Sequence, residues 1–430
     1  MNDWYDSVPS HWHRARVKSV AGRVTDGAHI SPETENGLYD FVSTRDVKAG
    51  RINFAGSLKT SQETYDYMVK TGCQPNLGDV LFSKDGTVGE TAVVTEQRDF
   101  VVASSLVIIT PRPGVMVPSY LAYVFESRPA QEQAASFMRG AGLPRLSVGN
   151  LARLELLVPP MDEQHAIADY LDRETARIDT LVEEQQRLIE TLRERRRALR
   201  VHVALHGTAP TEEVKSSLPW ANQLPSSWRV VPLTSVAQLE SGHTPSRSRE
   251  DWWTDCYIPW VSLHDVGTMR GTKYLQDTKQ RISDAGIANS SARLLPARTV
   301  VLSRDATVGR TAIMGVPMAT SQHFAAWVCG PALDPEYLWV LFADAMQPFF
   351  DSFQNGSTIR TIGMGDLKAF RIPLPPLDEQ RRIVEYLDKE TPKIDTLIAE
   401  MERFIELSRE RRAALITAAV TGHIDLREMA

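Results

Sequence analysis

Apolar residues recur at helical spacing in two long segments that are otherwise rich in charged residues. The first segment follows Pro159, and its apolar stripe contains Ile178, Leu181, Leu188, Ile189, Leu192 and Leu199. The second follows Pro375, and its stripe contains Ile394, Leu397, Ile398, Met401, Phe404, Ile405 and Leu415. This heptad-like spacing with charged flanks predicts two long helices, each of which buries one face against a partner helix.

Shorter signals divide each segment further. Each opens with a short amphipathic piece, formed by Ile167, Tyr170 and Leu171 in the first and by Ile383, Tyr386 and Leu387 in the second. Thr175 follows the first piece, and Thr391 with Pro392 follows the second. A Thr N-cap before a Pro at the first helical position predicts that a helix begins again there. Gly207 and Gly422 stand where C-terminal helix caps belong.

The two segments are copies of one another, because about thirteen of twenty residues agree from positions 162 and 378 onward. The copies extend into the rest of the chain, where VPSHW (8–12) matches LPSSW (224–228), LFSKDGTVGETAV (81–93) matches VLSRDATVGRTAI (301–313), and PSYLAYVF (118–125) matches PEYLWVLF (335–342). The strings at 81 and 301 predict hairpins, and those at 118 and 335 predict short helices. Between these landmarks the two halves diverge almost completely, which suggests two modules with the same job and different targets.

The order along the chain is therefore globular, helical, globular, helical. We expect domains at residues 1–158 and 209–374, a central helical region at 159–208 and a C-terminal helical region at 375–430. The polar stretch at 206–218 predicts a linker. Two copies of one apolar stripe within a single chain can bury each other, so an antiparallel pair of coiled-coil helices with pseudo-two-fold symmetry is the favoured arrangement.

Composition limits the functional classes. The 430 residues carry a net charge of −6, and the three cysteines form no CxxC pair, which argues against a disulfide framework or a zinc site. No secretion signal or membrane-spanning apolar run is recognisable, so we expect a cytoplasmic protein. Most nucleic-acid binders are basic, and the bulk charge lowers the expectation of that class without excluding a local arrangement of charge.

Few residue patterns suggest catalysis. The string Asp334-Pro335-Glu336-Tyr337 is similar to the D-P-P-Y motif of amino-methyltransferases, but position 117 in the other half is Val, and no Gly-rich loop follows a strand. A Pro that opens a helix with an inward-facing Tyr is the favoured interpretation. Asp-Glu-Gln at 162–164 and at 378–380 is interpreted as acidic residues that favour a helix N-terminus, with Gln closing a cap. The histidines form no metal-binding pattern, and we predict no metal site.

Basic residues gather in two Gly-containing loops, at 139–145 and 355–360. Glycines allow close backbone approach, and Arg145 and Arg360 could reach a phosphate or a guanine edge. An exposed connection with incidental charge explains these loops about equally well. The arginines at 193–200 and 409–412 are interpreted as helix-end cations and solvated coiled-coil flanks.

Along essentially its whole length the chain resembles the specificity (S) subunit of Type I restriction-modification systems. The strings that carry the resemblance are LPSSW, GHTPS, SRDATVGRTAI, PLPPLDEQRRIVEYLD, TPKIDTLI and ERRAALITAAVTGHIDLR. The first copy departs from the family ending, with RVHVALHGTAP in place of ITAAVTGHIDLRE. The resemblance implies an α+β fold in which residues 1–158 and 209–374 are mixed α/β target recognition domains, separated by two long antiparallel helices.

It further implies that the chain reads a bipartite DNA target without catalysing a reaction. Two methyltransferase (M) subunits and the restriction (R) subunits would be its partners, and S-adenosylmethionine, ATP and Mg would belong to them. The candidate DNA-contacting residues are Lys84, Arg139, Arg145, Arg304, Ser357 and Arg360. The candidates for interhelical packing or partner docking are Leu171, Ile178, Leu181, Leu188, Leu192, Leu387, Ile394, Leu397 and Phe404. An adenine methyltransferase and a coiled-coil scaffold without DNA binding are the alternatives.

Overall fold

A computed structural model describes residues 8–30, 37–138, 144–353 and 361–424. It divides into two compact units, one of residues 1–186 with 402–430 (unit 1) and one of residues 187–401 (unit 2). Each unit therefore combines a globular part with portions of both long helices, α6 (Met161–His206) and α11 (Leu377–Val420). The four-part division at residues 158, 208 and 374 stays a prediction.

Unit 1 contains an antiparallel sheet in the order β2 (Ala21–Asp26), β10 (Leu106–Pro111), β7 (Val80–Ser83), β8 (Thr91–Val93). A second sheet has the order β6 (Leu58–Thr60), β3 (Tyr39–Val42), β9 (Phe100–Val102), and two-stranded pairs join β1 (His13–Arg16) to β11 (Glu155–Val158) and β4 (Val47–Lys48) to β5 (Arg51–Ile52). The helices of its globular part are α1 (Val17–Val20), α2 (Gln62–Lys70), α3 (Pro118–Glu126), α4 (Arg128–Phe137) and α5 (Val148–Leu151).

Unit 2 repeats this plan. Its larger sheet has the order β15 (Ala237–Ser241), β22 (Phe324–Cys329), β19 (Val300–Ser303), β20 (Thr311–Met314), β17 (Tyr274–Leu275). The smaller sheet has the order β18 (Arg281–Ile282), β16 (Ile258–Val261), β21 (Ala319–Thr320), and two pairs join β14 (Arg229–Pro232) to β23 (Arg371–Leu374) and β12 (Glu213–Leu218) to β13 (Ala221–Pro225). Its helices are α7 (Asp284–Ala288), α8 (Pro335–Val340), α9 (Gln347–Asp351) and α10 (Met364–Ala369).

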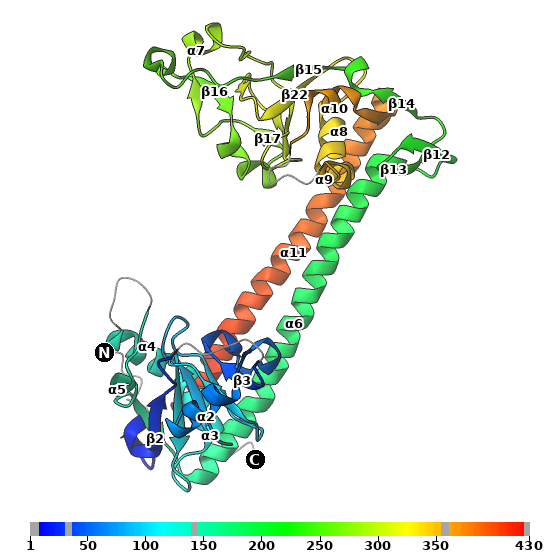
Figure 1. Cartoon of the computed structure of the whole chain (residues 1–430). Coiled ribbons are helices and arrows are strands. Elements are labelled where there is room, and N and C mark those ends of the chain that lie inside the picture. Colours follow the sequence, from blue (N-terminus) through cyan, green and yellow to red (C-terminus); the bar gives the residue numbers. More distant parts are fainter. Residues whose placement is uncertain (1–7, 31–36, 139–143, 354–360, 425–430) are drawn as a thin grey trace. The chain divides into compact units, whose positions relative to one another are not determined.

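The core of each unit includes the start of one long helix and the end of the other (Figure 1). In unit 1, Leu171 of α6 and Ile416 of α11 join the residues that cover the larger sheet. In unit 2, Leu387 of α11 and Val203 of α6 do the same. The two helices are therefore antiparallel within each unit, and they derive part of their stability from the globular parts on which they pack. The predicted α+β class is confirmed.

Several local predictions are confirmed. β7 pairs with β8, and β19 with β20, as the predicted hairpins. α3 and α8 begin at Pro118 and Pro335. Gly207 and Gly422 adopt φ of 77° and 76° just beyond the two long helices, as a left-handed C-cap requires.

Two local predictions are wrong. The helices do not begin again at Thr175 and Thr391, because α6 and α11 are continuous and Pro392 lies inside α11. The Thr175 hydroxyl donates to the carbonyl of Leu171 one turn earlier (2.7 Å), so this Thr bonds within the helix and does not cap it. A Pro inside a helix removes one backbone hydrogen bond, and the packed turns on either side hold the helix together. The predicted linker also differs, because Glu213–Leu218 forms a hairpin with Ala221–Pro225.

Candidate functional site

One buried glutamine joins the globular part of unit 1 to the start of α6 by hydrogen bonds. The Gln164 side chain accepts a hydrogen bond from the Val117 N–H (2.8 Å) and donates to the carbonyl oxygens of Val115 (3.0 Å) and Pro159 (2.9 Å). The side chain is fully buried. The bonds to Val115 and Val117 tie the loop before α3 to the start of α6, and the buried Gln164 side chain would lose a partner if either broke.

Unit 2 contains the same arrangement around Gln380. This side chain accepts from the Asp334 N–H (2.8 Å) and donates to the carbonyl oxygens of Ala332 (3.0 Å) and Pro375 (2.9 Å). The sequence interpretation assigned both glutamines to helix capping, and the structure shows that they bind a separate loop. The acidic part of that interpretation is confirmed, because Asp162 and Glu163, like Asp378 and Glu379, lie in the first turn of their helices.

A tryptophan in each unit packs against the glycine that ends a long helix. In unit 1 a Cβ on Gly422 would lie 3.5 Å from the Trp12 ring, and the Trp12 indole N–H donates to Glu163 (2.8 Å). In unit 2 a Cβ on Gly207 would lie 3.5 Å from Trp228. The repeated Pro-Ser-x-Trp strings of the sequence therefore mark the junctions between a globular part and both long helices.

The inward-facing stripe of each long helix follows a regular alternation of three and four residues. On α6 the buried and half-buried positions include Leu171, Thr175, Ile178, Val182, Gln185, Ile189, Leu192, Arg196, Leu199 and Val203. On α11 they include Leu387, Thr391, Ile394, Ile398, Met401, Ile405, Ser408, Arg412, Leu415 and Ala419. This alternation is the spacing of a coiled-coil seam. Ion pairs lie along it in each unit, between Arg412 and Asp179 (3.2 Å) and between Arg196 and Asp395 (2.8 Å).

The predicted stripe was partly misplaced. Leu181 is 38% exposed, Leu188 40%, Leu397 44% and Phe404 41%, so these side chains lie on the flank of the seam. The other five candidates, Leu171, Ile178, Leu192, Leu387 and Ile394, are buried or half-buried. Val182, which the predicted stripe lacked, is buried beside the exposed Leu181, and Ile398, which the stripe contained, is buried beside the exposed Leu397. Whether the four exposed residues dock a partner stays a prediction.

Two of the candidate DNA-contacting residues meet at the hairpin turn after β7. Lys84 is buried, and its ammonium group pairs with Asp85 (3.1 Å) and Asp26 (3.7 Å). Arg145 is exposed and pairs with the other oxygen of Asp85 (2.7 Å), which raises the pKa of its guanidinium. Asp85 thus links the turn to Arg145, the last residue of the predicted Gly-containing loop at 139–145. Of the two cations, Arg145 is the one within reach of a ligand.

The matching turn in unit 2 has different partners. The half-buried Arg304 donates from Nε to the Ile362 carbonyl (3.0 Å). Asp305 accepts from the Thr361 hydroxyl (2.8 Å) and contacts His323 (2.8 Å). Burial would raise the pKa of Asp305, but these hydrogen bonds lower it. Arg139, Ser357 and Arg360 lie outside the described residues, and all six assignments to DNA contact stay predictions.

The divergent parts of the two halves share more than the sequence suggested. Ser43 and Asp46 form a capping box, and Ser262 and Asp265 form the same box after the matching strand of unit 2. Gly27 lies where a Cβ would meet the Val102 carbonyl at 2.1 Å, and Gly242 where it would meet that of Thr320 at 1.7 Å. Only glycine fits so close to another backbone. These common positions show that one scaffold carries two different surfaces.

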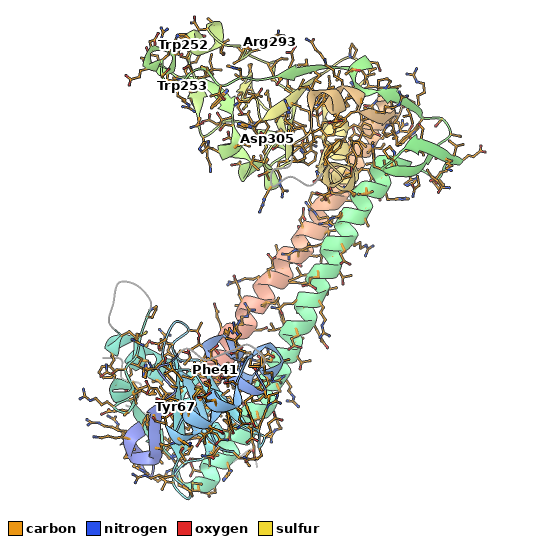
Figure 2. The ribbon with its side chains drawn as sticks, in the orientation of Figure 1. Phe41, Tyr67, Trp252, Trp253, Arg293 and Asp305 are labelled. Carbon is orange, nitrogen blue, oxygen red and sulfur yellow. The ribbon has the colours of Figure 1, made fainter. Side chains whose placement is uncertain are left out.

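Aromatic and basic residues gather in unit 2 around η4 (Glu250–Trp253). Arg247 lies over the ring of Trp253 (3.8 Å to its centroid), and Arg249 lies over that of Trp252 (4.8 Å). Figure 2 labels both tryptophans. Stacked aromatic and guanidinium groups are a chemistry that suits nucleic acids. The tryptophans and arginines of this segment are visible in the sequence, but the sequence analysis did not select them as candidate DNA-contacting residues.

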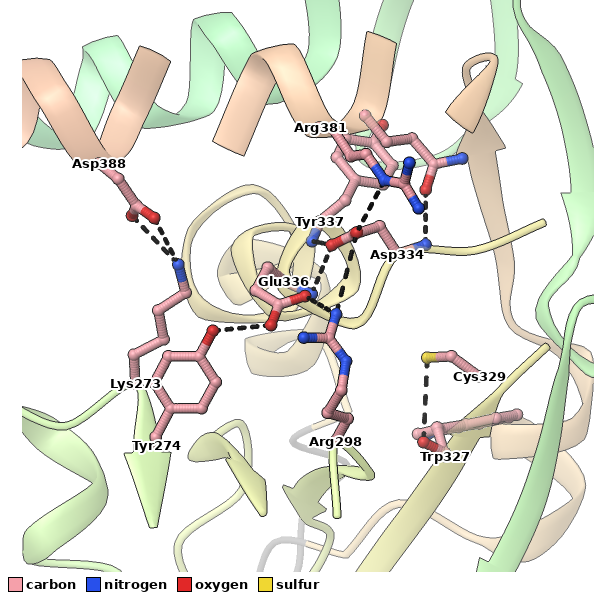
Figure 3. A network of polar contacts seen from close by, with 11 residues as sticks. Lys273, Tyr274, Arg298, Trp327, Cys329, Asp334, Glu336, Tyr337, Arg381 and Asp388 are labelled. Carbon is pink, nitrogen blue, oxygen red and sulfur yellow. Dashed lines mark hydrogen bonds and ion pairs between the residues drawn. The ribbon is translucent and has the colours of Figure 1, made fainter. Parts of the chain in front are cut away.

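The Asp334–Tyr337 string belongs to a structural network (Figure 3). The Asp334 carboxylate accepts from the N–H groups of Glu336 (3.0 Å) and Tyr337 (3.4 Å) as the N-cap of α8. Tyr337 is fully buried, and its hydroxyl donates to the Ala204 carbonyl (3.1 Å). Burial and the neighbouring Glu336 raise the pKa of Asp334. The expected helix start with an inward-facing Tyr is confirmed.

Two absences apply to the described residues alone. In residues 8–30, 37–138, 144–353 and 361–424 no three His, Cys, Asp or Glu side chains converge as metal ligands would. Within the same part of the chain no helix is long and apolar enough to cross a membrane.

The globular parts match a known family model twice. The model of the Type I restriction modification DNA specificity domain covers residues 9–191 and again residues 225–402. The chain belongs to this specificity family. Both matches run from the junction tryptophan through a globular part into a long helix, so the duplicated unit of the family is the one that repeats here.

Individual relatives agree with the family. The chain is 27% identical to the Type I restriction enzyme MjaIX specificity subunit of Methanocaldococcus jannaschii over 166 residues, which is 38% of each protein. The EcoR124I/EcoR124II specificity subunit of Escherichia coli matches at 24% over 42% of this chain and 45% of its own length. The MjaVIII specificity subunit of M. jannaschii matches at 20% over 98% of this chain and 95% of its own length.

Two solved structures share the fold. A chain from a structure of a type I R-M system superposes with a TM-score of 0.74 at 19% identity, covering 97% of this chain and all of its own. The HsdS subunit from Thermoanaerobacter tengcongensis superposes with a TM-score of 0.57 at 19% identity, over 97% and 98% of the two chains. These likenesses support the duplicated α+β fold of the specificity family.

Proposed function

We propose that the chain is the DNA-recognition subunit of a Type I restriction-modification complex, in which each unit reads one half of a bipartite target. The observation that carries this proposal is the double match to a DNA specificity domain, once per globular part. The shared scaffold and the different surfaces of the two parts support it. Because the same glutamine contacts join each globular part to its long helices, both parts would present their surfaces in the same orientation. The residues that differ between the two surfaces would then specify different bases.

The proposal includes a scaffolding role. The M subunits would dock on the long helices, whose exposed Leu181, Leu188, Leu397 and Phe404 offer apolar contacts beside the seam. R subunits would join that assembly, and S-adenosylmethionine, ATP and Mg would be bound by the partners. We assign no catalytic step to this chain, and we propose that it binds DNA in the cytoplasm.

The test is a chimera in which residues 1–158 are replaced by the equivalent part of another specificity subunit. Expressed with its M partner, the chimera should methylate a motif with one new half and one unchanged half. It should still co-purify with M, because α6 and α11 are untouched. Sequencing of methylated DNA reads out the motif. A motif altered in both halves, or a contiguous one, would contradict the two-reader proposal.

A further inference from the structure

A basic cleft in unit 2 lies where its globular part meets both long helices. It has a volume of about 660 Å³. Its walls come from the end of α6, the turn of α11 around Thr391, the loop at 269–273 and the hairpin turn at 309–311. Among the residues that the structure describes, seven Arg and Lys side chains and two carboxylates line it. Such an excess of one charge in a confined space creates a strong local potential that attracts ions of the opposite sign.

Both carboxylates of the cleft are already paired. Asp344 binds Arg200 (2.7 Å), and Asp388 binds Lys273 (2.9 Å). Arg197, Arg270 and Arg310 form no ion pair with any residue that the structure describes, although all of them line the same space. In the described part of the chain, therefore, no carboxylate pairs with these three guanidinium groups, which line a common volume.

Two buried donors point to a ligand independently of the arginines. The hydroxyl of Thr391, a residue only 5% exposed, has no hydrogen-bond partner among the described residues. The buried indole N–H of Trp339 likewise has none within that part of the chain. Both residues line the cleft. A buried donor without a partner costs free energy, and an oxygen-rich anion in the cleft would accept from both.

In unit 1 the side chains at the matching positions bind one another and leave a smaller cavity. There the Tyr123 hydroxyl donates to Asp172 (2.6 Å) and contacts the Thr175 hydroxyl (3.2 Å), and the cavity is about 190 Å³. Arg412 binds Glu126 (2.9 Å) as well as Asp179. In unit 2 Val340 and Ala343 occupy the positions of that tyrosine and glutamate. Unit 2 thus has neither the hydroxyl nor the carboxylate that these positions supply in unit 1.

We propose that this cleft binds backbone phosphates of the DNA duplex, independently of base sequence, so that unit 2 holds the duplex by a contact that unit 1 lacks. The proposal rests on the proposed function. Phosphate fits the observations because guanidinium groups bind its oxygens in pairs and its remaining oxygens accept from hydroxyl and indole donors. An acidic peptide would satisfy the charge, but the hairpin turn and loop of the cleft belong to the part that reads DNA.

The experiment measures how duplex affinity depends on salt. Each phosphate contact contributes about 0.9 to the slope of log K against log salt concentration. The triple variant Arg197→Gln, Arg270→Gln, Arg310→Gln should therefore lower the slope by about 2 to 3, and weaken binding tens of fold near 0.1 M salt. Fluorescence anisotropy of a labelled duplex with the full chain and its M partner gives both values.

A matched control removes the same charge elsewhere. Arg229→Gln, Arg382→Gln and Arg403→Gln lie outside the cleft, and the last two sit in exposed pairs within α11. This variant should keep most of the wild-type slope. A separate variant, Ala343→Glu, introduces the carboxylate that unit 1 has at this place, and should lower the slope by about 1. Circular dichroism checks that every variant is folded.

Each result decides between explanations. An unchanged slope in the triple variant overturns this inference and leaves the proposed function standing, whereas a wild-type complex that binds no duplex overturns both. If pyrophosphate or poly-glutamate binds the wild type through the three arginines while the slope for DNA stays unchanged, the cleft takes a free phosphoryl compound or an acidic peptide. Either finding contradicts a backbone contact.

Discussion

Where the globular part of each unit meets the long helices, unit 1 gathers Glu126, Asp172 and Asp179 around a small cavity, and unit 2 gathers arginines around a cleft more than three times as large. The surrounding scaffold is the same in both. A buried glutamine, a C-cap glycine and a junction tryptophan occupy matching positions in the two units.

The difference shows which contacts a duplicated chain must keep. Gln164 and Gln380 are fully buried and each pairs with three backbone groups, so a side chain that cannot both donate and accept there would lose these bonds. Glu126 and Ala343 instead line the cavity of unit 1 and the cleft of unit 2, and there the two side chains differ. Buried polar contacts therefore stay alike, and cavity-facing positions are the ones that acquire a separate role.

The largest effect is expected at the two glutamines. Gln164→Leu and Gln380→Leu should each destabilise the unit that contains them by about 3 kcal/mol, because one backbone N–H and two carbonyls lose their bonds to a buried side chain. Denaturant unfolding of the full chain measures the loss, and the exposed Gln186→Leu on α6 serves as the control. Very unequal decreases in the free energy of unfolding would mean that Gln164 and Gln380 do not have equivalent roles.

A smaller effect is expected from exchanging the cavity residues. Glu126→Ala should cost about 2 kcal/mol, since the mostly buried Arg412 keeps only Asp179 as a partner. Burial raises the pKa of Glu126 and Arg412 opposes this, so the pair is a desolvated one. The reciprocal Ala343→Glu should change stability by less than about 0.5 kcal/mol, because its neighbour Arg196 is half exposed. If both variants lowered the free energy of unfolding equally in the same assay, the proposed difference between the two positions would be contradicted.

The smallest effect concerns pH. Burial alone would raise the pKa of Asp40, but hydrogen bonds from Lys59, Ser57 and Arg98 lower it below its ordinary 3.8. A lowered folded-state pKa stabilises the protein above the ordinary value, and this contribution is lost as the pH falls through the lowered pKa. The stability difference between wild type and Asp40→Asn should thus be full near neutral pH and shrink below about pH 3.8.

Unit 2 provides the internal comparison for that measurement. The matching strand position is Pro259, which pairs in register with Arg281 as Asp40 does with Lys59. Having no carboxyl group, it contributes nothing of this kind to acid unfolding. Urea unfolding at several pH values would reveal the trend, and a difference independent of pH would show that the Asp40 carboxylate does not titrate with unfolding.

Local patterns in the sequence were sufficient for much of the fold. The offset repeats predicted two copies of one unit, the glycines at 207 and 422 predicted the helix ends, and the Pro residues at 118 and 335 predicted the short helices. These features depend on neighbours a few residues away. The same kind of reasoning failed at Pro392, where a strong local stop signal lies inside a helix that long-range packing keeps intact.

The sequence by itself determined that the chain is duplicated, that its two long helices are amphipathic, and which family it belongs to, because these properties depend on the order of residue types. The tertiary structure decided which face of each helix is buried, what Gln164 and Gln380 bind, and that arginines from α6 and from two distant loops line one cleft. Those features arise where segments far apart in the sequence meet, such as Val117 and Gln164, which are 47 residues apart, and only packing brings them together.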